Sequence, residues 1–285
     1  MSPRWMRTLL VSAFVAGLYG CEQPPAPAPA PEPPAAPAPG VPAKAPALDI
    51  AVLQAEAENV ALTPSPAEMQ AALAKAGIVH SLSDLVQTRK IDLDVENLDR
   101  VAVGTGVLVA DVVLTVKAAP KEDLVARLQA IQHGMKQLGG GTDIDNTLTD
   151  IVNRIQNDAV SRDALVRELD ELSGVMIPEI KYEKGERVVP LLQAGSWLEG
   201  ASLVSTAVTN SGKFDAADAL LKQPEVVSYF LNVVMVQGGA APDEVIAKLV
   251  ATLTSLQEIT SKTTPLTEED IKSIHEQTDA VLALL

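Results

Sequence analysis

Apolar residues recur at intervals of three and four positions through most of the chain after residue 48. This spacing places apolar side chains on one face of a helix, and it predicts an all-α fold, a multi-helix bundle of about ten helices. One such run is Leu124, Leu128, Ile131, Met135 and Leu138. The expected helices cover residues 49–61, 66–76, 82–90, 94–118, 121–138, 144–158, 162–173, 187–211, 224–237, 242–260 and 268–284, with uncertain short pieces near 176–186 and 214–222.

Helix-start and helix-stop residues agree with this division. Ser65 and Glu68 have the spacing of a capping box, and a proline between them suits the first helical turn. Thr267 stands before three acidic residues and should begin the last helix. Gly77 and the glycines at 139–141 and 238–239 are typical of helix ends.

Two long apolar segments, 101–116 and 188–209, are expected to form two central helices. Both are rich in small residues, which allow helix backbones to approach closely. An offset of ninety aligns the two segments loosely, so an internal duplication into two helical halves is one interpretation. A membrane span at 101–116 is disfavoured, because the segment is short and has Asp111 in its middle.

Asp111 and Glu199 are the two acids inside these apolar runs. A buried acid is costly unless it is paired, so each should have a cationic or hydrogen-bonding partner or an elevated pKa. Either each acid has a structural role, in a buried ion pair or at the edge of its helix, or the two acids line a polar pocket between the central helices. Trp197, close to Glu199, is expected to anchor the core, with a role at a binding surface as the alternative.

The first twenty residues have the pattern of an export signal. Arg4 and Arg7 precede an uncharged apolar stretch that is too short to be a transmembrane helix. The stretch ends in Leu18-Tyr19-Gly20-Cys21, and this cysteine is the only one in the chain. An ordinary cleaved signal peptide with an incidental cysteine is the plainer interpretation.

The run at residues 18–21 resembles the lipobox of bacterial lipoproteins. The resemblance implies a signal peptide at 1–20, cleavage before Cys21, a diacylglyceryl thioether on its sulfur and often an acyl chain on the new amino terminus. Two or more acyl chains anchor a protein stably, whereas one does so only marginally. We expect anchoring to the cell envelope of a Gram-negative host, at the outer membrane facing the periplasm. The inner membrane is the alternative.

Residues 21–48 form the expected linker, which separates the lipidated cysteine from the body at 49–285. Eleven of the twenty prolines fall within residues 22–48, where they preclude regular helix and sheet. Pro-Ala repeats favour extended polyproline II, so this segment could span up to roughly 80 Å. A spacer is the expected role, and a ligand for a proline-binding domain or a thread through peptidoglycan is the alternative.

The chain is acidic, and loss of Arg4 and Arg7 with the signal peptide takes its formal charge from −15 to −17. This charge argues against nucleic acid as a partner and against peripheral binding to anionic lipid headgroups. The three histidines, His80, His133 and His275, form no metal-binding or catalytic motif. The glycine-rich turn at 139–146 lacks the residues of a phosphate or calcium loop.

These observations favour a lipid-anchored envelope protein with a helical interaction or scaffolding body. No catalytic residue, metal site or cofactor is expected. A solute- or lipid-binding lipoprotein with a pocket between the central helices is the first alternative. An enzyme that uses a cleft around Asp111 or Glu199 is the second.

Overall fold

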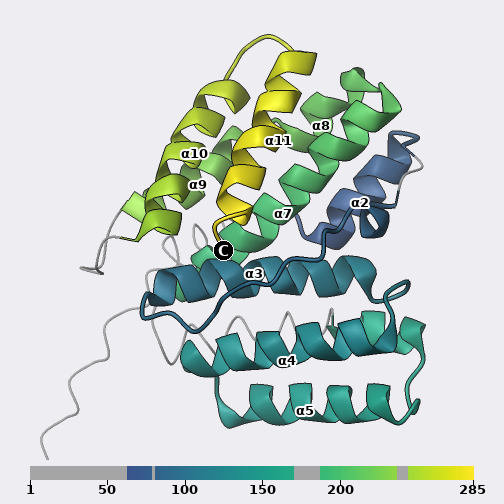
Figure 1. Ribbon diagram of the computed structural model, residues 1–285. Coiled ribbons are helices and arrows are strands. Elements are labelled where there is room, and N and C mark those ends of the chain that lie inside the picture. Colours follow the sequence, from purple (N-terminus) through teal and green to yellow (C-terminus); the bar gives the residue numbers. More distant parts are fainter. Residues whose placement is uncertain (1–62, 79–80, 170–186, 236–242) are drawn as a thin grey trace, which may run out of the picture. The chain divides into compact units, whose positions relative to one another are not determined.

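The computed structural model describes residues 63–78, 81–169, 187–235 and 243–285 (Figure 1). These residues form helices joined by turns and loops, with no strand among them, so the all-α fold is confirmed. The α-helices are α2 (Pro66–Lys75), α3 (Leu98–Thr115), α4 (Lys121–Gln137), α5 (Thr142–Gln156), α7 (Val188–Ser211), α8 (Ala217–Leu221), α9 (Pro224–Met235), α10 (Glu244–Thr260) and α11 (Glu268–Leu282). Residues 162–169 are also helical, and 3₁₀ turns occur at η1 (Leu82–Asp84) and η2 (Phe214–Ala216). The helix expected at 49–61 and the short piece near 176–186 lie outside the described residues.

The two apolar segments form the two central helices, α3 and α7, as predicted. Their crossing depends on one glycine from each helix. A Cβ added to Gly106 would lie 2.0 Å from the carbonyl oxygen of Leu192, and one added to Gly195 would lie 2.0 Å from that of Val103. No side chain fits at either position, so the two backbones pack directly against each other and leave no cavity at this point.

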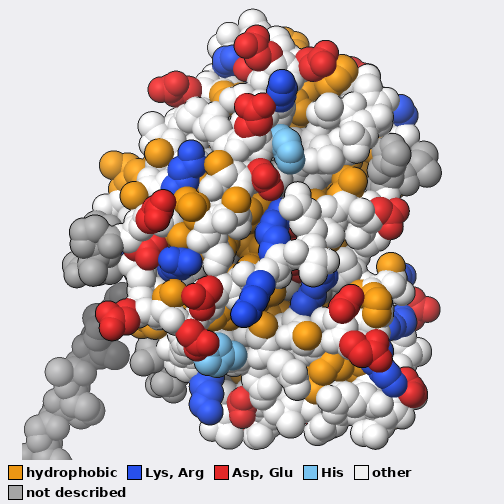
Figure 2. Space-filling view, viewed as in Figure 1, with side chains coloured by type: hydrophobic (Ala, Val, Ile, Leu, Met, Phe, Trp, Pro, Cys, Tyr) orange, Lys and Arg blue, Asp and Glu red, His pale blue; other side chains and the backbone are white. Residues whose placement is uncertain are grey.

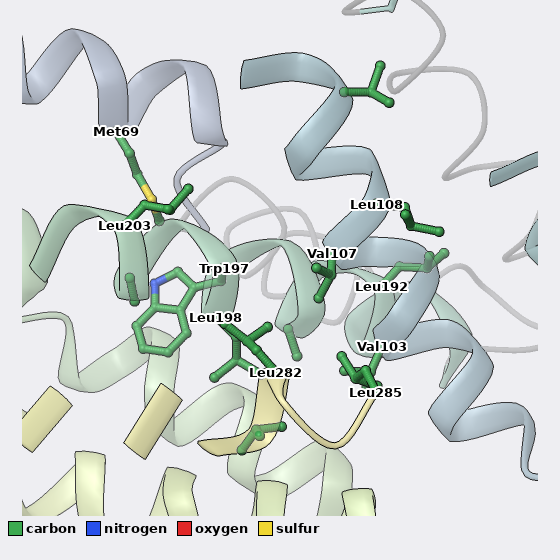
Figure 3. Close-up of a cluster of buried hydrophobic side chains, with 14 of the residues drawn as sticks. Met69, Val103, Val107, Leu108, Leu192, Trp197, Leu198, Leu203, Leu282 and Leu285 are labelled. Carbon is green, nitrogen blue, oxygen red and sulfur yellow. The ribbon is translucent and has the colours of Figure 1, made fainter. Parts of the chain in front are cut away.

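The other helices form layers on either side of this crossing (Figure 1). Helix α4 packs on α3, and α5 packs on α4, so α4 and α5 form a hairpin on one side of the bundle. Helices α2 and α11 pack on α7, while α9 and α10 pack against each other beside α11. Figure 3 shows the buried apolar centre, where side chains from α2, α3, α7 and α11 meet.

Several helix ends lie where the sequence predicts them, because local capping residues fix their positions. Ser65 and Glu68 form a complete capping box at α2, and Thr267 forms one with Asp270 at α11. Gly77 and Gly139 follow α2 and α4 with φ of 72° and 80°, a left-handed conformation that glycine adopts without a steric penalty.

The helix expected at 82–90 is wrong. Only the single turn η1 forms, and the chain from residue 86 to Asn97 is not helical. In its second half, apolar and acidic residues alternate: Leu93 is buried, Ile91 and Val95 are half-buried, and the acidic residues between them are exposed. This period of two is the pattern of an extended segment, in which successive side chains point to opposite sides. The segment lies over α3, where a Cβ on Gly104 would meet the side chains of Ile91 and Leu93.

Helix α3 consequently begins later than expected, at Leu98 rather than near residue 94. Asn97 is its N-cap, and its side-chain oxygen accepts a hydrogen bond of 3.1 Å from the backbone N–H of Arg100. Asparagine is among the best N-cap residues, and the acidic residues before it belong to the extended segment.

Candidate functional site: a buried ionic cluster between the central helices

Asp111 and Glu199 come from the two central helices and are both buried. Asp111 lies on α3 with 3% of its surface exposed, and Glu199 lies on α7 with none exposed. Burial of a carboxylate is costly unless the charge is paired or neutralised. The sequence predicted this cost for each acid separately, and the structure brings the two acids together.

Arg89 provides the positive charge for Glu199. Its Nη1 donates to Glu199 Oε2 at 2.5 Å, and its Nη2 lies 3.5 Å from Asp279 Oδ1 on α11. The Arg89 side chain is 12% exposed, whereas that of Asp279 is 39% exposed, so the ion pairs run from the core towards the surface. Sequence reasoning placed Arg89 in a helix and did not predict this role.

One carboxylate oxygen of each buried acid has no conventional donor. Asp111 Oδ1 and Glu199 Oε1 are both buried and lack a hydrogen-bond partner in the structure. A proton on one acid would allow it to donate to the other, since the two side chains influence each other's pKa.

The electrostatics assign this proton to Asp111. Burial, reinforced by the charge of Glu199, raises the pKa of Asp111 from 3.8 to about 8. Burial also raises the pKa of Glu199, and the Arg89 guanidinium opposes this effect by stabilising the ionised form. Because Arg89 bonds Glu199 directly, these effects favour the ionised form at Glu199 and the protonated form at Asp111.

A second arginine contributes a positive charge near Asp111. Arg127 on α4 lowers the pKa of Asp111 through its charge, yet its Nη1 donates to Thr115 Oγ1, at 2.9 Å. The Thr115 hydroxyl in turn donates to the backbone carbonyl of Asp111, at 2.6 Å. Arg127 on α4 is therefore linked through the Thr115 hydroxyl to the backbone of Asp111.

A histidine lies one turn along α11 from Asp279. His275 Nδ1 is 3.3 Å from the hydroxyl oxygens of both Ser202 and Thr206 on α7. Ser202 is only 2% exposed, and it sits within a continuous helix rather than at a helix N-terminus or turn that could supply oxyanion donors. This contact therefore adds a polar link between α7 and α11.

Trp197 is a core residue with a polar end. It is 2% exposed, its ring lies 5.9 Å from that of Phe230, and Figure 3 shows it beside Leu198. Its indole N–H donates to Gln223 Oε1 at 3.0 Å. Gln223 also lines an open groove of about 450 Å³ between α2 and the α8–α9 region, which includes Met69, Leu220 and Lys222.

The remaining candidates lie apart from this cluster. His133 is exposed on α4 and contacts Asp94 at 2.8 Å, whereas His80 lies outside the described residues. The glycine-rich turn before α5 borders a pocket of about 160 Å³.

Within the described ranges, no group of three or more histidine, cysteine or acidic residues is arranged to hold a metal ion. None of the described helices combines the length and apolarity needed to cross a membrane.

No protein-family profile matches the chain, and neither the curated proteins nor the solved structures contain a match to it.

Proposed function

We propose that the chain is a lipid-anchored protein of the bacterial cell envelope whose helical body binds another envelope protein. The observation that carries this proposal is the position of the only cysteine, Cys21, at the end of a short apolar export signal. Lipid on this residue anchors the protein, and the Pro/Ala-rich residues 22–48 hold the body away from the membrane.

The net charge of the chain indicates the kind of partner that the body would bind. Acidic and basic side chains are interspersed across the face in Figure 2, with hydrophobic side chains in small groups between them. The formal charge of −17 after loss of the signal peptide favours a partner with a basic surface. Such a partner would be attracted at low ionic strength and released as salt rises.

The test is crosslinking in the producing cell, followed by affinity capture of the body. A Cys21→Ser variant, which cannot carry the thioether lipid, is the control. We expect a stoichiometric envelope protein with the wild-type chain and its loss with Cys21→Ser. Capture of no protein by the anchored chain would refute the binding proposal, and equal capture by both chains would refute its dependence on the lipid anchor.

The groove between α2 and α9 favours one alternative function, the binding of a small amphipathic ligand. Its volume of about 450 Å³ falls in the range of ligand sites, and its lining combines Met69 and Val226 with Lys222 and Glu225. Native mass spectrometry of the purified chain would reveal a co-purifying ligand. Loss of this ligand in Ala72→Phe, which fills the groove, would support the alternative.

A further inference from the structure

The open groove between α2 and the α8–α9 region has a floor that belongs to the core. Its buried lining residues are Met69 on α2, Leu220 on α8 and Val226 on α9, which are 4%, 5% and 6% exposed. Met69 is held against α7, since a Cβ on Gly200 would lie 2.2 Å from its sulfur. Figure 3 shows this side chain reaching from α2 towards α7. The packing of the core therefore fixes the floor of the groove.

Small side chains on both walls keep the groove open. Ala72 on α2 is half-buried and Ala219 on α8 is exposed, so each wall presents a methyl group where a larger side chain would fill the space. The charged lining residues are Glu68, Lys222 and Glu225, and the two acids among them are exposed. An apolar floor with charged edges suits the apolar face of an amphipathic helix.

The chain enters the described body at one edge of this groove. Pro64 lines the groove, and both Pro64 and Thr63 are half-buried, so the chain lies against the body at this point. Residue 61 is three positions before Pro64 and so lies within about 11 Å of it. A segment that ends here is tethered beside the groove, which gives it an effective concentration on the order of millimolar.

Residues 49–61, where the sequence predicts a helix, have the pattern of a suitable occupant. Their larger apolar residues and one alanine recur at intervals of three and four and share one helical face: Ile50, Leu53, Ala57 and Val60. Asn59 falls on the opposite face. A helix of this length would be about 20 Å long, enough to run alongside α2. Thr63 precedes a proline and favours extended backbone, so the helix would end before it and the chain could fold back.

We propose that residues 49–61 form an amphipathic helix that binds, through its apolar face, in the groove between α2 and the α8–α9 region of the same chain. The short connection through Thr63 and Pro64 favours this segment over a free ligand. While it is bound, the segment occupies the groove and excludes other ligands from it. This inference goes beyond the proposed envelope function and does not depend on it, because neither the groove nor the segment includes Cys21.

The first test examines the segment. Amide hydrogen exchange of the full-length chain in detergent should be slow over residues 49–61, and this protection should be lost in Leu53→Asp, which places a charge on the apolar face. Asn59→Asp is the matched control, because it introduces the same side chain on the opposite face, and its exchange should match the wild type. Unprotected residues 49–61 in the wild-type chain, or equal exchange in the two variants, would overturn the proposal.

The second test examines the groove. Ala72→Phe and Ala219→Phe fill the groove from its two walls, so each should cause residues 49–61 to lose their protection. Ala74→Phe is the control, because Ala74 is exposed on α2 and does not line the groove, and its protection should be that of the wild type. Protection that survives both filling variants would show that the segment binds elsewhere.

The third test identifies the occupant. Native mass spectrometry of the chain released from detergent should give the mass of one chain with no added molecule. A dimer that Leu53→Asp converts to a monomer would assign the groove to the segment of a second copy. A co-purifying small molecule that is lost in Ala72→Phe, with residues 49–61 unprotected, would assign the groove to a ligand. Either result would overturn the contact within one chain.

Discussion

Asp111 and Glu199 show which part of a buried site is visible in a sequence. Each acid interrupts an apolar helical run, and this local pattern predicted a costly buried carboxyl that needs a partner or an elevated pKa. Their proximity and the identity of Arg89 depend on how distant segments pack, because Arg89 and Glu199 are 110 positions apart. A single sequence carries no direct signal for such a contact.

Asp111→Asn should stabilise the folded chain at pH 7 by at least about 1 kcal/mol. The folded pKa of about 8 exceeds the ordinary value of 3.8, so between these values the folded state binds a proton that the unfolded state does not. The free energy of unfolding therefore falls as pH rises from about 4 to 8, and its slope is at most the one that a difference of one bound proton gives. In Asp111→Asn this slope should flatten.

Urea unfolding at a series of pH values measures this effect. Asp163→Asn is the matched control, since Asp163 is 78% exposed in a surface contact with Lys117. Its stability should follow that of the wild type at every pH. The account fails if Asp111→Asn is less stable than the wild type at pH 7 and retains the full slope.

Arg89→Met should destabilise the fold by about 3–5 kcal/mol, because it leaves the charge of Glu199 buried without its cation. The double variant with Glu199→Gln should recover part of this loss, since the unpaired charge is then gone. Arg154→Met is the comparison: its partner Glu168 is 30% exposed, so the loss should be below about 1 kcal/mol. Chemical unfolding provides all three values, and equal losses for Arg89→Met and Arg154→Met would contradict a buried ionic cluster.

At the scale of elements, the helix pattern and the caps were largely readable from the sequence. The spacing of apolar residues gave the positions of α2, α4, α7, α10 and α11 to within two residues at each end, because these helices have clear polar faces, caps or long apolar runs. The helix predicted over residues 82–90 is wrong, because the chain there leads into an extended segment whose sequence signal is the alternation from Ile91 to Val95. An extended segment that packs on helices without joining a sheet has only this short signal.

Gly106→Ala and Gly195→Ala should each lower the free energy of unfolding by about 1–3 kcal/mol or more. Each added Cβ would lie 2.0 Å from a backbone carbonyl oxygen, which can move only if the helices separate. Gly104→Ala is the control on the same helix, because its Cβ would meet the side-chain ends of Ile91 and Leu93, which can adjust. Thermal unfolding ranks the three variants, and a larger loss in Gly104→Ala would contradict the backbone crossing.

At the scale of the whole molecule, the sequence predicts an anchor, a spacer and a folded body. The anchor is predicted from the run at residues 18–21, and the spacer from the proline content of residues 22–48. Both lie outside the described ranges. The described helices confirm the all-α nature of the body, and the proposed function rests on the sequence of residues 4–48.

A change of the linker tests whether it acts as a spacer or as a specific ligand. Replacement of residues 22–48 by a Gly-Ser segment of equal length should preserve partner capture, because only reach is needed. Deletion of these residues should reduce capture while the unfolding midpoint of the body stays the same. Loss of capture in the Gly-Ser replacement would instead indicate that the Pro/Ala sequence is itself recognised.

The most direct measurement for the proposed function is mass spectrometry of the mature N-terminal peptide, isolated from the envelope of the producing cell. The proposed lipid anchor predicts a peptide that begins at Cys21 and carries the mass of a diacylglyceryl thioether. It also predicts that Cys21→Ser is recovered without this mass. A mature chain that begins elsewhere, or a Cys21 with a free thiol, would contradict the lipid anchor on which the proposed function rests.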